Sequence, residues 1–170
     1  MSGICNAYPI AVHRSVLAGM SKGDVSDDIL NGTEIGNFGW LRWPWDTSGG
    51  SAPILAEALR RPTTSEFQNC DIENEPDDTH LSVGDWVCSN TGVSNDIKVR
   101  TALDNLMYKG WIRIVVWDEH TDDQGGANGA YHAEKFAIVK LKDYWLPSSG
   151  TKGNSIKIEF VRYDSTGCIE

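Results

Sequence analysis

The hydrophobic and polar positions of the chain repeat with two periods, one typical of strands and one of helices. Residues 155–163 alternate apolar and polar side chains, which predicts a strand with Ile156, Ile158 and Phe160 facing the core. In residues 95–109 the apolar positions instead recur at i, i+3, i+4, i+7 and i+8, which predicts an amphipathic helix. Its apolar stripe consists of Val99, Ala102, Leu103, Leu106 and Met107.

Two longer apolar segments predict strands of a different kind. Trp111 to Asp118 is hydrophobic on nearly both faces, which is typical of a central strand. Tyr131 to Leu146 reads as a long strand whose apolar phase shifts near Ile138. Such a shift predicts a bulge or bend that lets one strand serve a barrel or two sheets.

The remaining elements are shorter. Tyr8 to His13 predicts an edge strand, because Pro9 cannot donate to a ladder. Ser26 to Leu30 predicts one capped helical turn, and Ser51 to Arg61 predicts a helix with an apolar stripe and a proline stop. Strands therefore outnumber helices, which predicts a β-rich α+β fold: a β-barrel or sandwich of about six strands with one or two packed helices.

Length and charge narrow the class of protein. The 170 residues fit a single globular domain spanning 1–170, with a core from about 5 to 168. Twenty-four acidic against 15 basic residues give a net charge of −9, which disfavours nucleic acid and anionic membrane surfaces as partners. No run of membrane-spanning length occurs, and the first twenty residues lack a signal-type apolar core. If the protein is exported, we expect the sequence to be a mature or excised piece.

Four cysteines suggest a disulfide framework. Cys5, Cys70, Cys88 and Cys168 lie far apart, without the close spacing of a zinc site. Of the three possible pairings we favour Cys5–Cys168 with Cys70–Cys88, because domain termini often lie close together. Four buried thiols in a cytosolic protein are the alternative.

One group of polar residues is a candidate for chemistry. Asp118, Glu119 and His120 end a predicted strand, and His132 follows the next loop. Two imidazoles and two carboxylates can bind a metal ion or perform acid–base chemistry. The alternative is a charged strand end that meets water, because no known ligand spacing occurs here.

Two further stretches raise the question of calcium. The loops 71–78 and 121–129 carry oxygen ligands, but neither has the EF-hand pattern. A solvated acidic loop and a flexible hairpin loop are the expected interpretations, so we expect no cofactor, with calcium as the exception.

Seven tryptophans are many for this length. Trp40, Trp43 and Trp45 form a cluster that could either fill the core or stack on sugar rings and protein partners. Trp86, Trp111 and Trp117 lie in strand-like runs and are expected in the core.

A set of motifs in chain order resembles a known bacterial family. They are Tyr8-Pro9-Ile10-Ala11-Val12, Gly36-Asn37-Phe38-Gly39-Trp40-Leu41, Val83-Gly84-Asp85-Trp86-Val87, Thr91-Gly92-Val93, Val99-Arg100-Thr101-Ala102-Leu103-Asp104, Val116-Trp117-Asp118, Tyr131-His132, Phe136-Ala137 and Phe160-Val161-Arg162-Tyr163. Their succession is similar to the C-terminal extracytoplasmic region of TadG-like Flp pilus-assembly (tight adherence) proteins. The resemblance covers about Cys5 to Cys168, and a cysteine near each end is part of it. It implies an envelope location, and no catalytic residues carry over from the family to this sequence.

These observations together predict a non-enzymatic structural or adhesive module at the bacterial cell surface. We expect it to act through contacts with other envelope or pilus proteins, or with copies of itself. Two alternatives remain open: a carbohydrate-binding module that uses Trp40, Trp43 and Trp45, and a hydrolase that uses the Asp118, Glu119, His120 and His132 group.

Overall fold

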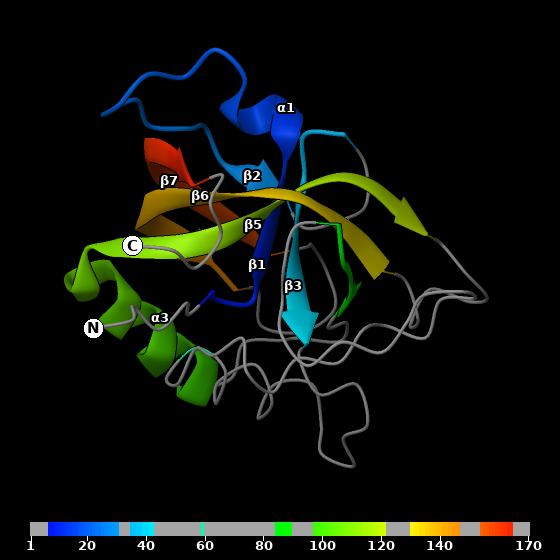
Figure 1. Ribbon diagram of the computed structural model, residues 1–170. Coiled ribbons are helices and arrows are strands. Elements are labelled where there is room, and N and C mark those ends of the chain that lie inside the picture. Colours follow the sequence, from blue (N-terminus) through cyan, green and yellow to red (C-terminus); the bar gives the residue numbers. More distant parts are fainter. Residues whose placement is uncertain are drawn as a thin grey trace, which may run out of the picture.

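The chain folds into a curled β-sheet that is accompanied by helices (Figure 1). The computed structural model describes residues 7–30, 35–42, 59, 84–89, 97–121, 130–146 and 154–164. Their elements, in chain order, are β1 (Ile10–His13), α1 (Arg14–Leu17), β2 (Ile29–Leu30), β3 (Phe38–Arg42), β4 (Trp86–Ser89), α3 (Ile97–Lys109), β5 (Trp111–Thr121), β6 (Ala130–Trp145) and β7 (Ser155–Asp164). The predicted β-rich α+β fold is confirmed.

The long strand β6 is the centre of the sheet. One of its edges pairs with β5, while the other pairs with β4 near its start and with β7 over the rest. β5 pairs with β1 in parallel, and β1–β3 and β3–β4 are antiparallel. The pairings β6–β5–β1–β3–β4–β6 therefore return to their starting strand, as in a barrel, while β7 and β2 extend the sheet beyond it.

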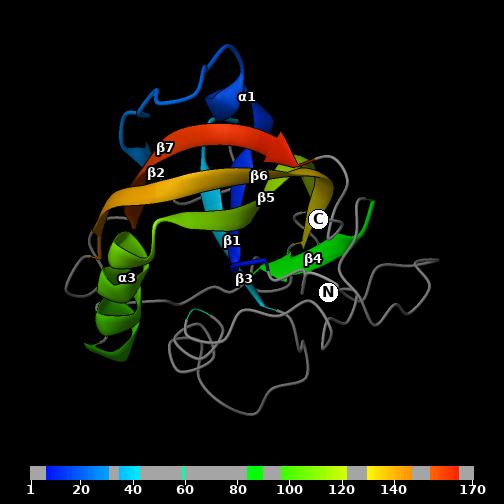
Figure 2. The ribbon, with the colours of Figure 1, turned by 60° about the vertical axis from the view of Figure 1, so that its left-hand side comes forward.

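Side-chain alternation divides most of the core into two clusters, a larger and a smaller one, on opposite faces of the strands, and Cys88 and Ala130 form a separate pair. In β1, Ile10 and Val12 belong to the larger cluster and Ala11 to the smaller one, as the strand period of two requires. The helix α3 covers the larger cluster and lies beneath the arch of β5, β6 and β7 (Figure 2). It contributes Val99, Ala102, Leu103 and Leu106, as its apolar stripe predicted, whereas Met107 is 39% exposed.

A glycine makes room for an aromatic ring within the smaller cluster. Gly39 lies inside β3, and a Cβ atom built on it would overlap the ring and hydroxyl of Tyr131 on β6. Tyr131 is 3% exposed, so its ring cannot move into solvent without giving up buried contacts. Gly39 is therefore needed for close packing between β3 and β6.

The bend predicted in the long strand occurs where the phase of the sequence shifts. The register between β6 and β7 slips between Ile138 and Val139, and again between Leu141 and Asp143. The central position predicted for the 111–118 strand also holds, because β5 pairs with both β1 and β6. Gly110 ends α3 with φ +98°, a left-handed conformation that glycine adopts without strain.

Two of the predicted elements are wrong. Residues 8–13 do not form an edge strand: β1 begins at Ile10, after Pro9, and pairs on both sides with β3 and β5. Residues 26–30 do not form a helical turn, because Ile29 and Leu30 are the strand β2 and pair with β7. In both cases long-range strand pairing overrides a local signal. The predicted helix 51–61 lies outside the described residues except for Leu59, which is buried in the larger cluster.

Candidate functional site

The polar group at the end of β5 is built around a β-bulge. Trp117 pairs with Ala133 and His120 pairs with Tyr131, so β5 advances three residues while β6 advances two. The two residues in between, Asp118 and Glu119, therefore lie opposite the single residue His132. A regular strand would send two consecutive side chains to opposite faces, whereas a bulge alters their directions.

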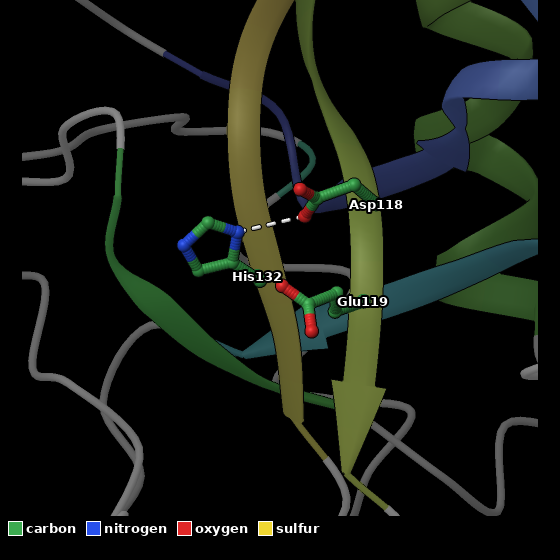
Figure 3. A group of neighbouring side chains, drawn as sticks. All are labelled: Asp118, Glu119 and His132. Carbon is green, nitrogen blue, oxygen red and sulfur yellow. Dashed lines mark hydrogen bonds and ion pairs between the residues drawn. The ribbon is translucent and has the colours of Figure 1, made fainter.

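The three side chains meet as a compact cluster (Figure 3). His132 Nδ1 lies 2.7 Å from Asp118 Oδ1, which is a strong hydrogen bond between two partly exposed side chains. One potential ligand atom from each of Asp118, Glu119 and His132 lies within 4.8 Å of the other two. The ring of His132 also lies 5.0 Å from that of Trp86 on β4.

His120, the fourth residue predicted for this group, lies elsewhere. Its ring contacts Trp117 at 5.5 Å between centroids, and Trp117 also contacts His13 at 4.4 Å and Tyr131 at 5.0 Å. Trp117 and Tyr131 belong to the smaller buried cluster. The structure therefore separates the cluster of Asp118, Glu119 and His132 from an aromatic layer around the buried Trp117, which the partly buried His120 contacts.

His13 is a member of the aromatic layer that the sequence did not single out. It is 6% exposed, and its Nδ1 accepts a hydrogen bond from the backbone N–H of Ser15 at the start of α1. Burial lowers the pKa of His13, and the neighbouring Arg14 lowers it further. The carboxylates of Asp118 and Glu134 oppose this shift without reversing it. The arrangement favours a neutral imidazole that packs on Trp117.

The tryptophans are distributed differently from the predicted cluster. Trp40 is 1% exposed and packs edge-on against Phe38. It therefore fills the core and is not part of a binding surface. Trp43 and Trp45 lie outside the described residues. Trp117 is in the core as expected, but Trp111 is not, because 55% of its surface is exposed at the first position of β5.

Trp145 belongs to an exposed row across three strands. Directly opposed residues in neighbouring strands point to the same side of a sheet. Leu30 on β2 opposes Ser155 on β7, and Ser155 opposes Trp145 on β6. Leu30 is 57% exposed and Trp145 is 59% exposed, on either side of the buried Ser155.

A second row runs parallel to the first. Val25 opposes Glu159, Glu159 opposes Lys140, and Lys140 opposes Trp111. Val25 is 49% exposed, so this row also has an apolar side chain at each end. We call the surface formed by these two rows, Leu30–Ser155–Trp145 and Val25–Glu159–Lys140–Trp111, the outer face. Its pattern could not be found from the sequence, because it depends on the register of strands that are distant along the chain.

Cys88 is the one cysteine among the described residues. It is disulfide-bonded and 6% exposed at the end of β4. Cys5, Cys70 and Cys168 lie outside the described residues, so the pairings Cys5–Cys168 and Cys70–Cys88 stay predictions. The loops 71–78 and 121–129, considered for calcium, likewise fall outside them apart from Thr121 at the end of β5.

Comparisons with known proteins found no match. The chain matches no family model, no curated protein and no solved structure. Within the described residues, no helix is long and apolar enough to cross a membrane.

Proposed function

We propose that the chain is a non-enzymatic adhesive or structural module of a bacterial surface assembly, and that its outer face is the contact surface. The observation that carries this proposal is the exposure of Trp145 and Leu30 on the same side of the sheet. Large apolar side chains gathered on one surface are typical of binding sites. Tryptophan in particular supplies much of the binding energy of protein interfaces.

The charged residues on the outer face and beside it support a protein partner. Glu159 lies 3.4 Å from Lys142 and 3.9 Å from Lys140, and Lys157 lies 3.7 Å from Asp28. These pairs balance the charge of the sheet locally, although the whole chain carries −9. The outer face thus combines exposed apolar side chains with locally balanced charges, and both kinds of surface occur in ordinary protein interfaces.

The proposed location is extracytoplasmic. A disulfide at Cys88 fits an oxidising compartment, since the cytosol keeps thiols reduced. The resemblance to the exported region of TadG-like pilus-assembly proteins supports the same location. Other envelope or pilus proteins, or further copies of this chain, are the partners that this context suggests.

Carbohydrate binding is a second candidate, favoured by Trp111 and Trp145. Both rings are more than half exposed on the outer face, and the charged residues Lys140 and Glu159 lie in the same row as Trp111. Trp145 lies five positions along β6 from Lys140, which opposes Trp111, so the backbone positions of the two tryptophans lie roughly 15 Å apart at the strand rise. An extended polysaccharide can bridge two rings at that spacing.

The deciding experiment uses a double variant of the outer face. Trp145→Ala with Leu30→Ala should reduce surface attachment of the producing bacterium to the level of a gene deletion. Tyr108→Ala is the matched control, because Tyr108 is 91% exposed but lies on α3. Equal attachment by the double variant and the wild type would refute the proposal.

Two further measurements separate the alternatives. Binding of the purified protein to a glycan array, abolished by Trp111→Ala, would replace the protein partner with a polysaccharide. Hydrolytic activity of the purified protein that is lost in His132→Ala would instead favour the hydrolase hypothesis. We expect neither, and we expect His132→Ala to attach like the wild type.

A further inference from the structure

We infer that Asp118, Glu119 and His132 form a binding site for a divalent transition-metal ion of the zinc class. The site lies where β5 bulges against β6 (Figure 3). This inference is independent of the contact function, because none of the three residues belongs to the outer face.

The bulge brings the ligands together. Asp118 and Glu119 occupy the two positions of β5 that oppose His132, because the register moves by three residues on β5 and two on β6. Bulges are frequent next to functional sites, where they redirect side chains. The ligands here lie on paired strands, which is the kind of support that holds metal-binding side chains in place.

The donor atoms select the class of metal. One imidazole nitrogen with two carboxylate oxygens suits zinc, which binds nitrogen and oxygen ligands and commonly takes three from the protein and one from water. Calcium and magnesium prefer oxygen ligands throughout, so the imidazole disfavours them. The cluster therefore fits a borderline metal ion better than the calcium considered from the sequence.

The charge of the cluster also calls for a cation. Asp118 is hydrogen-bonded to His132, whereas Glu119 forms no ion pair within the part of the chain that the structure describes. The nearby Arg14 is paired with Glu134, at 3.1 Å. The cluster thus contains two carboxylates and one imidazole, and a divalent ion would neutralise the negative charge of the carboxylates.

The geometry needs only small side-chain movements to hold an ion. The ligand atoms lie within 4.8 Å of one another, and bonds of about 2 Å to zinc bring ligand atoms to within about 4 Å. Glu119 is exposed and can move, whereas His132 is held between Asp118 and the ring of Trp86. The ion would replace the 2.7 Å hydrogen bond between His132 and Asp118 and join β5 to β6 at the bulge.

The test is calorimetric titration of zinc chloride into the untagged full chain, with the disulfide bond of Cys88 intact. We expect one saturable zinc site per chain. Calcium chloride should bind more weakly, with a larger dissociation constant. Glu119→Gln and His132→Ala should each weaken zinc binding by at least about tenfold. Asp143→Asn is the matched control, because Asp143 is an exposed carboxylate on β6 away from the bulge, and it should bind like the wild type.

A second readout locates the ion. Zinc should shift the imidazole NMR signals of His132 most, and those of His13 much less, because His13 packs against Trp117 and is not one of the clustered ligands. Should His132→Ala fail to fold, Glu119→Gln still decides, since an exposed side chain changes little else. Absence of saturable binding, equal binding by Glu119→Gln and the wild type, or the largest zinc shift at a histidine other than His132 would each overturn the inference.

Discussion

Arg113 on β5 and Asp164 on β7 form an ion pair that crosses the strand between them. Arg113 Nε lies 2.6 Å from Asp164 Oδ2, and the two side chains are 12% and 4% exposed. Both strands pair with β6, so the contact links the two neighbours of the central strand. It therefore ties the end of the chain's last described strand to the barrel.

Removal of one partner should be strongly destabilising. Asp164→Ala leaves the Arg113 guanidinium without this carboxylate in a mostly buried position, and we expect a loss of about 3–5 kcal/mol in the free energy of unfolding. The measurement is urea unfolding followed by tryptophan fluorescence. Glu134→Gln is the control, because its pair with Arg14 is more exposed and should contribute less than about 1 kcal/mol. Similar losses of unfolding free energy in both variants would contradict the prediction that the more buried ion pair contributes more to stability.

The close contact between Gly39 and Tyr131 leads to a second prediction. Gly39→Ala should destabilise the protein by about 1–3 kcal/mol, because the added methyl group overlaps the Tyr131 ring. When Tyr131→Ala is combined with it, the total loss should be smaller than the sum of the two single losses. Strict additivity in urea unfolding would show that the two side chains do not compete for the same space.

Local patterns in the sequence were sufficient for the elements whose stability depends on one buried face. The stripe Val99, Leu103 and Leu106 and the alternation of residues 155–163 each appear where expected. The patterns failed for β2 and for the edge position of β1, because these depend on which distant strand pairs alongside. The exposure of Trp111 was missed for a similar reason: its apolar neighbours along the chain are buried, but its own side of the sheet is open.

The candidate site shows the same division. The nearness of Asp118, Glu119 and His132 was predicted, since a strand end and the next strand's start meet across a hairpin. The exclusion of His120 could not be predicted, because it follows from one extra residue in the register of β5 against β6. The outer face also depends on register, across β2, β7 and β6.

The packing of α3 gives a third prediction. Leu103 is fully buried in the larger cluster, so Leu103→Ala should cost about 2–5 kcal/mol of unfolding free energy. Met107→Ala is the control on the same helix, because Met107 is 39% exposed and should lose much less. A change below about 0.5 kcal/mol for Leu103→Ala in urea unfolding would mean that this face of the helix is not packed against the sheet.

The pH dependence of stability should contain a contribution from His13. Burial lowers the pKa of His13 from its ordinary value of 6.5, so the unfolded chain takes up the proton more readily than the folded one. The contribution of His13 to the free energy of unfolding is therefore fully present above pH 6.5. It is lost as the pH falls toward the lower pKa that His13 has in the folded state. The charged and titratable groups that act on His13 are Arg14, Asp118, His120 and Glu134.

The variant His13→Asn isolates that contribution. Asparagine keeps a side-chain acceptor at the start of α1, where His13 Nδ1 accepts from the Ser15 N–H, but it does not titrate. The loss of the ring contact with Trp117 should lower stability at every pH, whereas the difference in stability between wild type and variant should shrink as the pH falls below 6.5. Urea unfolding of both proteins between neutral and mildly acidic pH measures this difference. A difference that stays constant across that range would show that His13 takes up its proton equally well in the folded and unfolded chains.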